Sequence, residues 1–311
     1  MTHTLFDAHC DTISAICDTR QELFENTCHI DLKKMSKNQH IQFFASFIDA
    51  KNDSLSPFKR ANQLINYYYK QIRKNSNLIS HCNSVFDINT ALAQNKTAAL
   101  LSIEGGEALE GKLENLFYFF DRGVRMMTLC WNYQNELCSG VDAPCDSGIT
   151  DFGFDVIRLM NKIGMLIDVS HMSEKSFWYT IGATKAPVVA SHSNIFSLKS
   201  HKRNLRKEQI EAVIENNGCI GINLYTEFLG DKACTTDDVL RHVEYILEMG
   251  GENNVGIGTD FDGMSSLPND ISSIKELEKI PEAMLKRGYD EALVKKITHT
   301  NFVRIVKDVV K

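Results

Sequence analysis

The sequence predicts a (β/α)8 barrel, also called a TIM barrel, formed by a single α/β domain. The prediction rests on eight short apolar runs, on amphipathic segments between them, and on a length of 311 residues without a linker rich in Pro, Gly or Ser. Strands covered by helices read as continuous apolar runs. A doubly wound open sheet is the main alternative, because it uses the same alternation of strand and helix.

The apolar runs are spread over the whole chain, and each has the length of a buried strand. The predicted strands are LFDAHC near the start, 41–48, 97–104, 124–131, 164–171, 186–193, 218–225 and 254–261. Helical periodicity is clear in 57–74, 153–164 and 235–251, several of which open with a capping Ser, Thr or Asp and close at Gly. One catalytic domain is expected over 1–311, with the last helices, in about 264–311, capping the barrel.

Composition excludes several classes of partner. The net charge of -6 disfavours binding to nucleic acid or to an anionic membrane. The N-terminus has no signal-peptide pattern, and no apolar run reaches membrane-spanning length. Nine cysteines are scattered without CxxC pairs, which is typical of buried thiols in a reducing compartment. We therefore expect a cytoplasmic protein that binds neither nucleic acid nor membrane.

Polar side chains stand at the carboxyl ends of the predicted strands, where barrel enzymes place their active sites. Histidines and carboxylates are the ligands that zinc and similar divalent ions use. The residues at these strand ends are His9, Asp11, Glu104, His171, His192, Tyr225 and Asp260. Any one histidine there could be a hydrogen-bonded rim residue, but the joint pattern favours a metal site.

The spacing of His9 and Asp11 suggests that they act together. Residues two apart on an extended strand point to one face, so both can bind one ion while Cys10 points away. Cys10 could be a nucleophile, but without an evident activating base it is better interpreted as a packing thiol. Glu104 precedes two glycines, and its two carboxylate oxygens could bridge a pair of metals.

The sequence favours Asp260 over Asp262 for the site and places the other histidines outside it. In DFDG, Asp260 at the strand end fits the site better than Asp262, although the motif could also be a magnesium pair or a plain turn. The remaining histidines occur in polar or helical contexts and are expected at the surface. They are His3, His29, His40, His81, His201, His242 and His299.

The motifs DAHCDT, SIEGGE, IDVSH, ASHSN, KRN and GIGTDFDG, in this order, resemble the renal or membrane dipeptidase family, peptidase family M19 of the amidohydrolase superfamily. The resemblance implies two divalent ions, expected to be Zn²⁺. His9 and Asp11 would hold the first and His171 and His192 the second, with Glu104 bridging both. It also implies a homodimer.

The resemblance also implies substrate-side residues. Arg203 matches the family arginine that grips the substrate carboxylate, a task suited to a guanidinium. Tyr225 matches a substrate-side tyrosine, and Asp260 matches the aspartate that handles the proton. Trp131 stands where the family usually has a histidine touching the scissile group, and its single N–H cannot titrate. Cys10 replaces a typical asparagine.

The expected reaction is hydrolysis of dipeptides, including those with a C-terminal D-residue, by attack of a metal-bridging hydroxide. An alternative is another binuclear amidohydrolase that acts on a lactone or a non-peptide amide. Sequences that resemble those enzymes begin with an HxH motif and have a modified lysine that bridges the metals, whereas this chain has HCD and Glu104. A non-catalytic barrel is a third alternative, but it predicts lost ligands, and all five are present.

Overall fold

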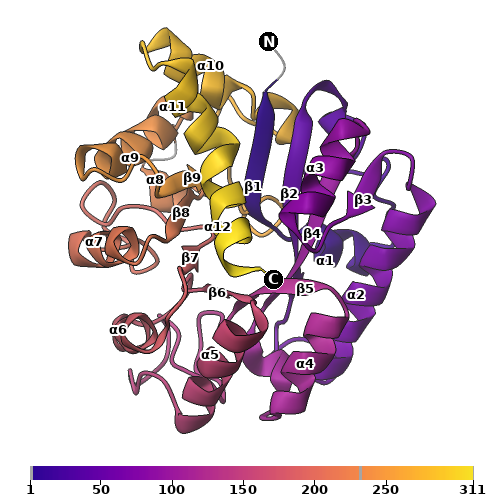
Figure 1. The fold of residues 1–311 in the computed structure, drawn as a ribbon, viewed down its shortest axis with the longest axis vertical. Coiled ribbons are helices and arrows are strands. Elements are labelled where there is room, and N and C mark those ends of the chain that lie inside the picture. Colours follow the sequence, from indigo (N-terminus) through magenta and orange to yellow (C-terminus); the bar gives the residue numbers. More distant parts are fainter. Residues whose placement is uncertain (1–2, 231–232, 311) are drawn as a thin grey trace.

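The computed structural model describes residues 3–230 and 233–310, in which eight parallel strands close into a barrel (Figure 1). β1 pairs with β2 on one side and with β9 on the other, and β2 pairs directly with β4. The barrel strands are β1 (Thr4–Cys10), β2 (Gln39–Phe47), β4 (Thr97–Glu104), β5 (Val124–Thr128), β6 (Leu166–Asp168), β7 (Val189–Ala190), β8 (Cys219–Ile222) and β9 (Val255–Ile257). The predicted (β/α)8 barrel is confirmed. The alternative of a doubly wound open sheet is wrong, because the pairing of β2 with β4 closes the sheet.

Each predicted strand corresponds to a barrel strand, but those on the β6 and β7 side are much shorter than expected. One physical reason is Asp168, whose Oδ1 accepts hydrogen bonds from the backbone N–H groups of Ser170 (3.0 Å) and Ser191 (2.9 Å). These two N–H groups donate to a side chain instead of to the carbonyl of a neighbouring strand, so strand pairing ends early. The sequence also missed β3 (Ile79–His81), a three-residue strand that pairs with the start of β4.

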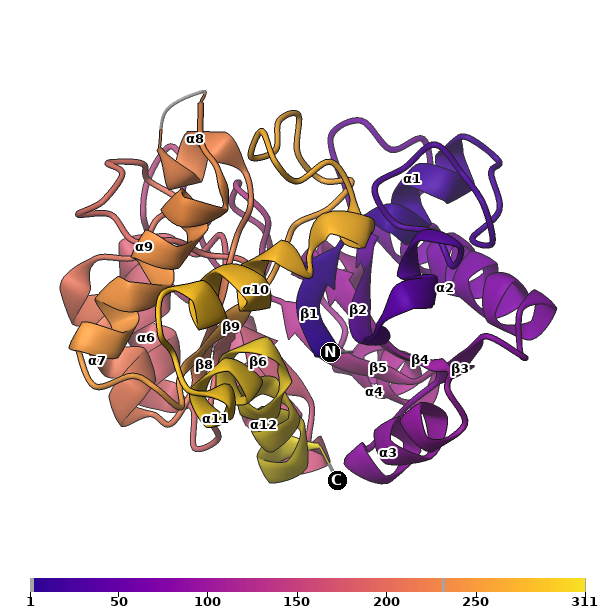
Figure 2. The same cartoon turned by 90° about the horizontal axis from the view of Figure 1, so that it is seen from above.

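Helices surround the barrel on its outer side (Figures 1 and 2). The helices are α1 (Thr12–Asp18), α2 (Pro57–Lys74), α3 (Val85–Ala93), α4 (Leu113–Asp121), α5 (Asp151–Ile163), α6 (Glu174–Ala183), α7 (Lys207–Glu215), α8 (Thr226–Leu229), α9 (Thr236–Glu248), α10 (Lys279–Lys286), α11 (Glu291–Lys295) and α12 (Asn301–Val309). The predicted helices 57–74, 153–164 and 235–251 correspond to α2, α5 and α9. In the described part of the chain, no helix has the length and apolar character needed to cross a bilayer.

Helix α12 lies across the amino-terminal end of the barrel, in front of the strands in Figure 1. Phe302 of α12 stacks on Phe6 of β1, with ring centroids 5.2 Å apart. Ile305, Val306 and Val309 of the same helix are buried in one cluster with inward residues of the strands. Because this end is filled with apolar side chains, the barrel interior leaves room for a polar site at the carboxyl ends of the strands.

Two histidines expected at the surface are in fact buried, so the prediction is wrong for His40 and His242. His40 is 2% exposed and His242 is 1% exposed. The Nδ1 of His242 accepts a hydrogen bond from the Ile195 N–H (3.1 Å), and its Nε2 donates to the Leu229 carbonyl (3.0 Å). Burial lowers the pKa of each imidazole to about 4, so both rings are neutral and structural at pH 7.

Candidate metal centre

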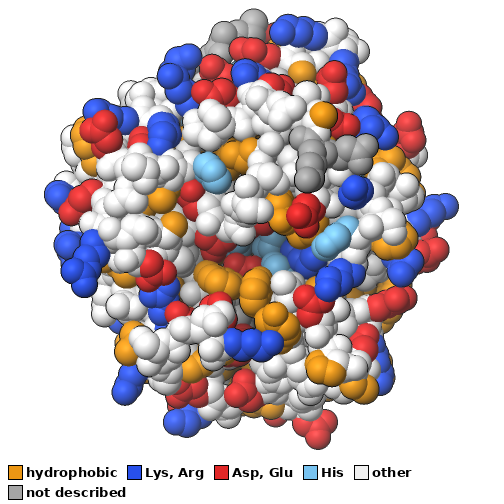
Figure 3. Space-filling view, turned by 180° about the vertical axis from the view of Figure 1, so that it is seen from behind, with side chains coloured by type: hydrophobic (Ala, Val, Ile, Leu, Met, Phe, Trp, Pro, Cys, Tyr) orange, Lys and Arg blue, Asp and Glu red, His pale blue; other side chains and the backbone are white. Residues whose placement is uncertain are grey.

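The five predicted ligands and Asp260 meet at the carboxyl end of the barrel. Figure 3 shows the face opposite to α12, with a hollow in which acidic and histidine side chains are visible. Each of these six residues is no more than 9% exposed. Such a concentration of buried carboxylates and imidazoles is costly unless the groups are paired or bind a cation.

Glu104, the last residue of β4, lies at the middle of the cluster. Its Oε1 is 2.9 Å from Nε2 of His171 and 3.6 Å from Nε2 of His192. Its Oε2 is 3.3 Å from Nε2 of His9. The two oxygens therefore face two different sets of ligands. Burial raises the pKa of the Glu104 carboxyl to about 7, with His9 opposing and Asp11 reinforcing the shift.

The first group comprises the two predicted ligands His9 and Asp11, together with Asp260. The Nε2 of His9 lies 3.4 Å from Asp11 Oδ2 and 3.9 Å from Asp260 Oδ1. Both ring nitrogens of His9 and Oδ1 of Asp11 are buried and lack a hydrogen-bond partner in the described chain. Burial opposes the charged imidazole, but Glu104 and Asp11 raise the pKa of His9 well above its usual value. A cation bound here would satisfy these atoms.

His171 and His192 form the second set, with their Nε2 atoms only 2.7 Å apart. The Nδ1 of His171 donates to Asn132 Oδ1, and the Nδ1 of His192 donates to Ser191 Oγ, each at 2.7 Å. Since each Nδ1 carries the proton, each Nε2 presents a lone pair toward the other and toward Glu104. Burial lowers the pKa of both histidines well below the usual value. A divalent cation between these atoms would replace repulsion by coordination.

The backbone is strained at two residues of the cluster. His171 has φ 69° and Asp260 has φ 61°, values that residues other than Gly rarely adopt. Such strain costs on the order of 1–3 kcal/mol per residue and is found mainly at functional sites. The fold therefore fixes the direction of these two side chains at some cost to stability.

Sequence reasoning missed the residues that orient the candidate ligands. Besides Asn132, they include Asp168, whose Oδ2 accepts from Ser191 Oγ at 2.6 Å and thereby supports His192. Asn223 donates from Nδ2 to Asp260 Oδ2 at 2.9 Å. Asp168 lies within the motif IDVSH, Asn132 follows Trp131 and Asn223 stands two residues before Tyr225, but nothing in a single sequence distinguishes them from ordinary buried polar residues. Their role follows from contacts between different strands.

Gly263 is a further missed residue, and it yields a testable prediction. A Cβ added there would lie 2.2 Å from Asp11 Oδ2 and 2.6 Å from Asp260 Oδ1. Both atoms belong to side chains rather than to the backbone, so Gly263→Ala should change the melting temperature little but displace two carboxylates. We expect metal affinity or kcat to fall roughly 10–100-fold, as for other changes beside metal ligands.

The matched control is Gly182→Ala in α6, where an added Cβ meets nothing within 4 Å. It should retain metal and activity. If metal titration and kinetics give the same values for both variants and the wild type, Gly263 has no role in placing the carboxylates.

The expected substrate-side residues occupy three places around the cluster. Arg203 is 5% exposed, and its Nη2 donates to the His192 carbonyl at 3.3 Å. With His171, it lines a cavity of 210 Å³ next to the cluster. Trp131 is partly exposed, with its ring centroid 6.3 Å from that of His171. Tyr225 is also partly exposed, and its OH lies 3.2 Å from Ser265 Oγ.

Cys10 and Asp262, neither of which is a predicted site residue, both have structural roles. Cys10 is fully buried, its Sγ donates to the Phe43 carbonyl at 3.4 Å, and burial raises its thiol pKa well above the usual value. Asp262 accepts from Thr12 Oγ1 at 2.5 Å and from the His29 N–H at 2.6 Å. Cys10 is thus a packing thiol rather than a thiolate nucleophile, and Asp262 ties loops together.

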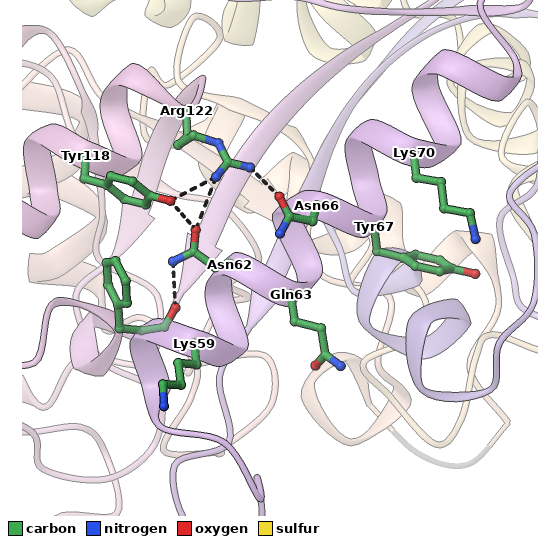
Figure 4. Close-up of a pocket in the computed structure, with 9 residues that line it drawn as sticks. Lys59, Asn62, Gln63, Asn66, Tyr67, Lys70, Tyr118 and Arg122 are labelled. Carbon is green, nitrogen blue, oxygen red and sulfur yellow. Dashed lines mark hydrogen bonds between the residues drawn. The ribbon is translucent and has the colours of Figure 1, made fainter.

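A second concave surface lies on the outside of the barrel, between α2 and α4 (Figure 4). There the guanidinium of Arg122 donates to Asn62 Oδ1, Asn66 Oδ1 and the Tyr118 OH. None of the predicted site residues lines this groove. It is separate from the metal centre.

A (β/α)8 barrel with three histidines and three carboxylates at its carboxyl end has the architecture of a metal-dependent hydrolase of the amidohydrolase type. The described residues include two overlapping groups whose ligand atoms lie within 4.8 Å of one another, one of His9, Glu104 and His192 and one of His9, Asp11 and Asp260.

The chain belongs to the membrane dipeptidase family, peptidase family M19, whose sequence profile matches residues 1–311. An uncharacterized dipeptidase of Schizosaccharomyces pombe is 31% identical over 283 residues, covering 85% of this chain and 67% of that protein. The family resemblance is confirmed. The protein is therefore a metallo-dipeptidase that uses divalent metal, and the match to this family disfavours the lactonase alternative.

Two solved structures are similar over the whole fold. The crystal structure of dipeptidase AC, an M19 metallopeptidase, is 25% identical with a TM-score of 0.91, covering 100% of this chain and 99% of that one. A metallopeptidase from Rhodobacter sphaeroides, bound to a phosphinate mimic of the dipeptide L-Ala-D-Ala, is 24% identical with a TM-score of 0.91. That likeness covers 99% of this chain and 100% of the other.

Proposed function

We propose that this metallo-dipeptidase holds two zinc ions and hydrolyses dipeptides with a free C-terminal carboxylate. His9 and Asp11 would hold one ion, His171 and His192 the other, and Glu104 both. The observation that carries the proposal is the position of Glu104, whose two oxygens face His9 on one side and His171 and His192 on the other. Imidazole and carboxylate ligands suit zinc.

The metal ions supply Lewis-acid chemistry when bound, which means that they polarise a carbonyl and lower the pKa of a water. The chain itself supplies proton transfer. The Asp260 carboxylate accepts the proton that the attacking water loses, on the side of the site next to His9, and the Asn223 amide holds its Oδ2 at 2.9 Å. Asp260 then passes the proton to the leaving amine. Burial raises the Asp260 pKa to about 6, close to the range that proton transfer at neutral pH requires.

Arg203 supplies substrate recognition in this proposal. Its guanidinium is buried beside the His192 carbonyl, and its Nε has no hydrogen-bond partner in the described residues. A carboxylate would satisfy that buried N–H and could form a bidentate pair. Because the arginine lies next to a metal ligand, the carboxylate must be close to the scissile bond. This restricts substrates to dipeptides and similarly short amides.

Replacement of Arg203 tests the proposal. Arg203→Ala should lower kcat/KM for a dipeptide by roughly 100-fold or more, because a charge-assisted pair to a buried group contributes about 3 kcal/mol. The loss should be small for the matched dipeptide amide, which lacks the carboxylate. The measurement is kcat/KM for both substrates in each variant.

The exposed neighbour Lys202, replaced by Ala, is the control and should keep the preference for the free carboxylate. An equal loss on the dipeptide and its amide in Arg203→Ala would contradict carboxylate recognition. The panel should include L-Ala-L-Ala and L-Ala-D-Ala, because a C-terminal D-residue is part of the proposed substrate class. The homodimer and the cytoplasmic location expected from the sequence stay predictions.

A further inference from the structure

Three aromatic side chains that the proposed reaction does not use form a wall at the mouth of the metal centre. Trp131 packs against Phe47 with ring centroids 5.2 Å apart, and against Tyr133 at 5.5 Å. All three are partly exposed, and Trp131 reaches within 6.3 Å of the His171 ring. We call Phe47, Trp131 and Tyr133 the aromatic wall. Figure 3 shows hydrophobic side chains beside the hollow on this face.

The barrel topology places Phe47, at one end of this wall, opposite Arg203. Phe47 ends β2, whereas Arg203 follows β7, and three strands separate β2 from β7 in either direction around the barrel. Trp131 and Tyr133 follow β5, which β6 separates from β7, and the packing of Trp131 against Phe47 continues the wall from Phe47 toward the His171 side of the site. A dipeptide that places its carboxylate on Arg203 and its scissile bond at the metal centre therefore extends its N-terminal residue toward the aromatic wall.

The positive charge of Lys51, next to the aromatic wall, restricts which substrate side chains can bind there. The Nζ of Lys51 lies 3.0 Å from the centroid of the Tyr133 ring, and among the described residues this ammonium has no carboxylate partner. A cationic substrate side chain would meet like charge there, whereas an apolar side chain would bury surface against the rings.

We propose that Phe47, Trp131 and Tyr133 bind the side chain of the N-terminal substrate residue, and that they favour large apolar residues over small or cationic ones. The inference rests on the proposed dipeptidase function and names the substrate class within it. Phe47, Tyr133 and Lys51 become specificity-determining residues of the site.

The test compares kcat/KM for Phe-Ala, Leu-Ala, Gly-Ala and Lys-Ala. The wild type should prefer Phe-Ala over Gly-Ala and over Lys-Ala by about tenfold or more. Phe47→Ala and Tyr133→Ala should each lower the Phe-Ala to Gly-Ala ratio several-fold, chiefly through KM, while Gly-Ala hydrolysis changes less than about threefold. Lys51→Gln should selectively improve Lys-Ala hydrolysis.

Phe86→Ala is the matched control, since Phe86 is 78% exposed on α3 and should leave every ratio unchanged. Phe47→Leu and Tyr133→Leu provide conservative variants if an alanine variant does not fold, and they should lower Phe-Ala more than Leu-Ala. Unchanged ratios in folded variants would overturn the aromatic subsite alone. If the wild type hydrolysed none of the dipeptides while retaining its metal, the proposed function and the subsite would fail together.

Discussion

Glu104→Gln is expected to remove most of the metal and to lower kcat by about three orders of magnitude. Glutamine keeps the volume of glutamate but loses the charge and offers only one oxygen. The oxygen that faces His9 and the oxygen that faces His171 can then no longer both bind a cation. Loss of several kcal/mol of Lewis-acid stabilisation corresponds to roughly 10³-fold in rate. Metal content by elemental analysis and kcat on a dipeptide measure the two effects.

The control for Glu104→Gln is Glu107→Gln, three residues further along the same motif. Glu107 is partly buried but belongs to neither group of ligand atoms. It should keep both metal and turnover. If Glu104→Gln retains two ions per chain and near-normal kcat, the carboxylate does not bridge a binuclear centre.

Asp260→Asn should abolish most turnover while leaving the metal content largely intact. Asparagine keeps the shape and the contact with Asn223 but cannot take up a proton. General acid–base catalysis contributes typically 10²–10⁴-fold, so kcat should fall by about that factor. The measurement pairs kcat with elemental analysis of the same preparation. Near-normal turnover would remove Asp260 from the catalytic role.

The pH profile provides a second readout for Asp260. The acting form is the carboxylate, and burial raises its pKa to about 6. Activity of the wild type should therefore rise with pH as the carboxyl loses its proton. Because bound cations stabilise the charged form, this rise should end at or below about pH 6. The limb should be absent in Asp260→Asn. Asp262→Asn is the control and should cost mainly stability, since Asp262 binds Thr12 and the His29 backbone.

The residues that meet at the candidate metal centre could be predicted because the carboxyl ends of parallel barrel strands gather at one end of the barrel. His9, Glu104 and His192 each end an apolar run, so the sequence alone indicated that they would meet. The strand TAALLSIE was predicted at its observed bounds because it is buried along its whole length. Where the fold is regular, hydrophobic patterning is sufficient.

The rest could not be predicted because it depends on contacts between distant segments. Asp168 replaces ladder hydrogen bonds of β6 and β7, which shortens both strands. The closeness of Gly263 to Asp11 arises only when β1 and β9 pair. His242 looks like a surface residue of an amphipathic helix, yet it satisfies the backbone of the loop after β7. Such pairings leave no local sequence signal.

Dipeptide hydrolysis by this protein should depend on chelatable metal held at the strand ends, and removal and return of the metal is the decisive experiment. Purified protein is analysed for metal and assayed on L,L and L,D dipeptides, then treated with a chelator and assayed again, and finally reloaded with Zn²⁺. We expect two zinc ions per chain, loss of activity on chelation and recovery on reloading. Dipeptide hydrolysis that continues after complete removal of metal would contradict it.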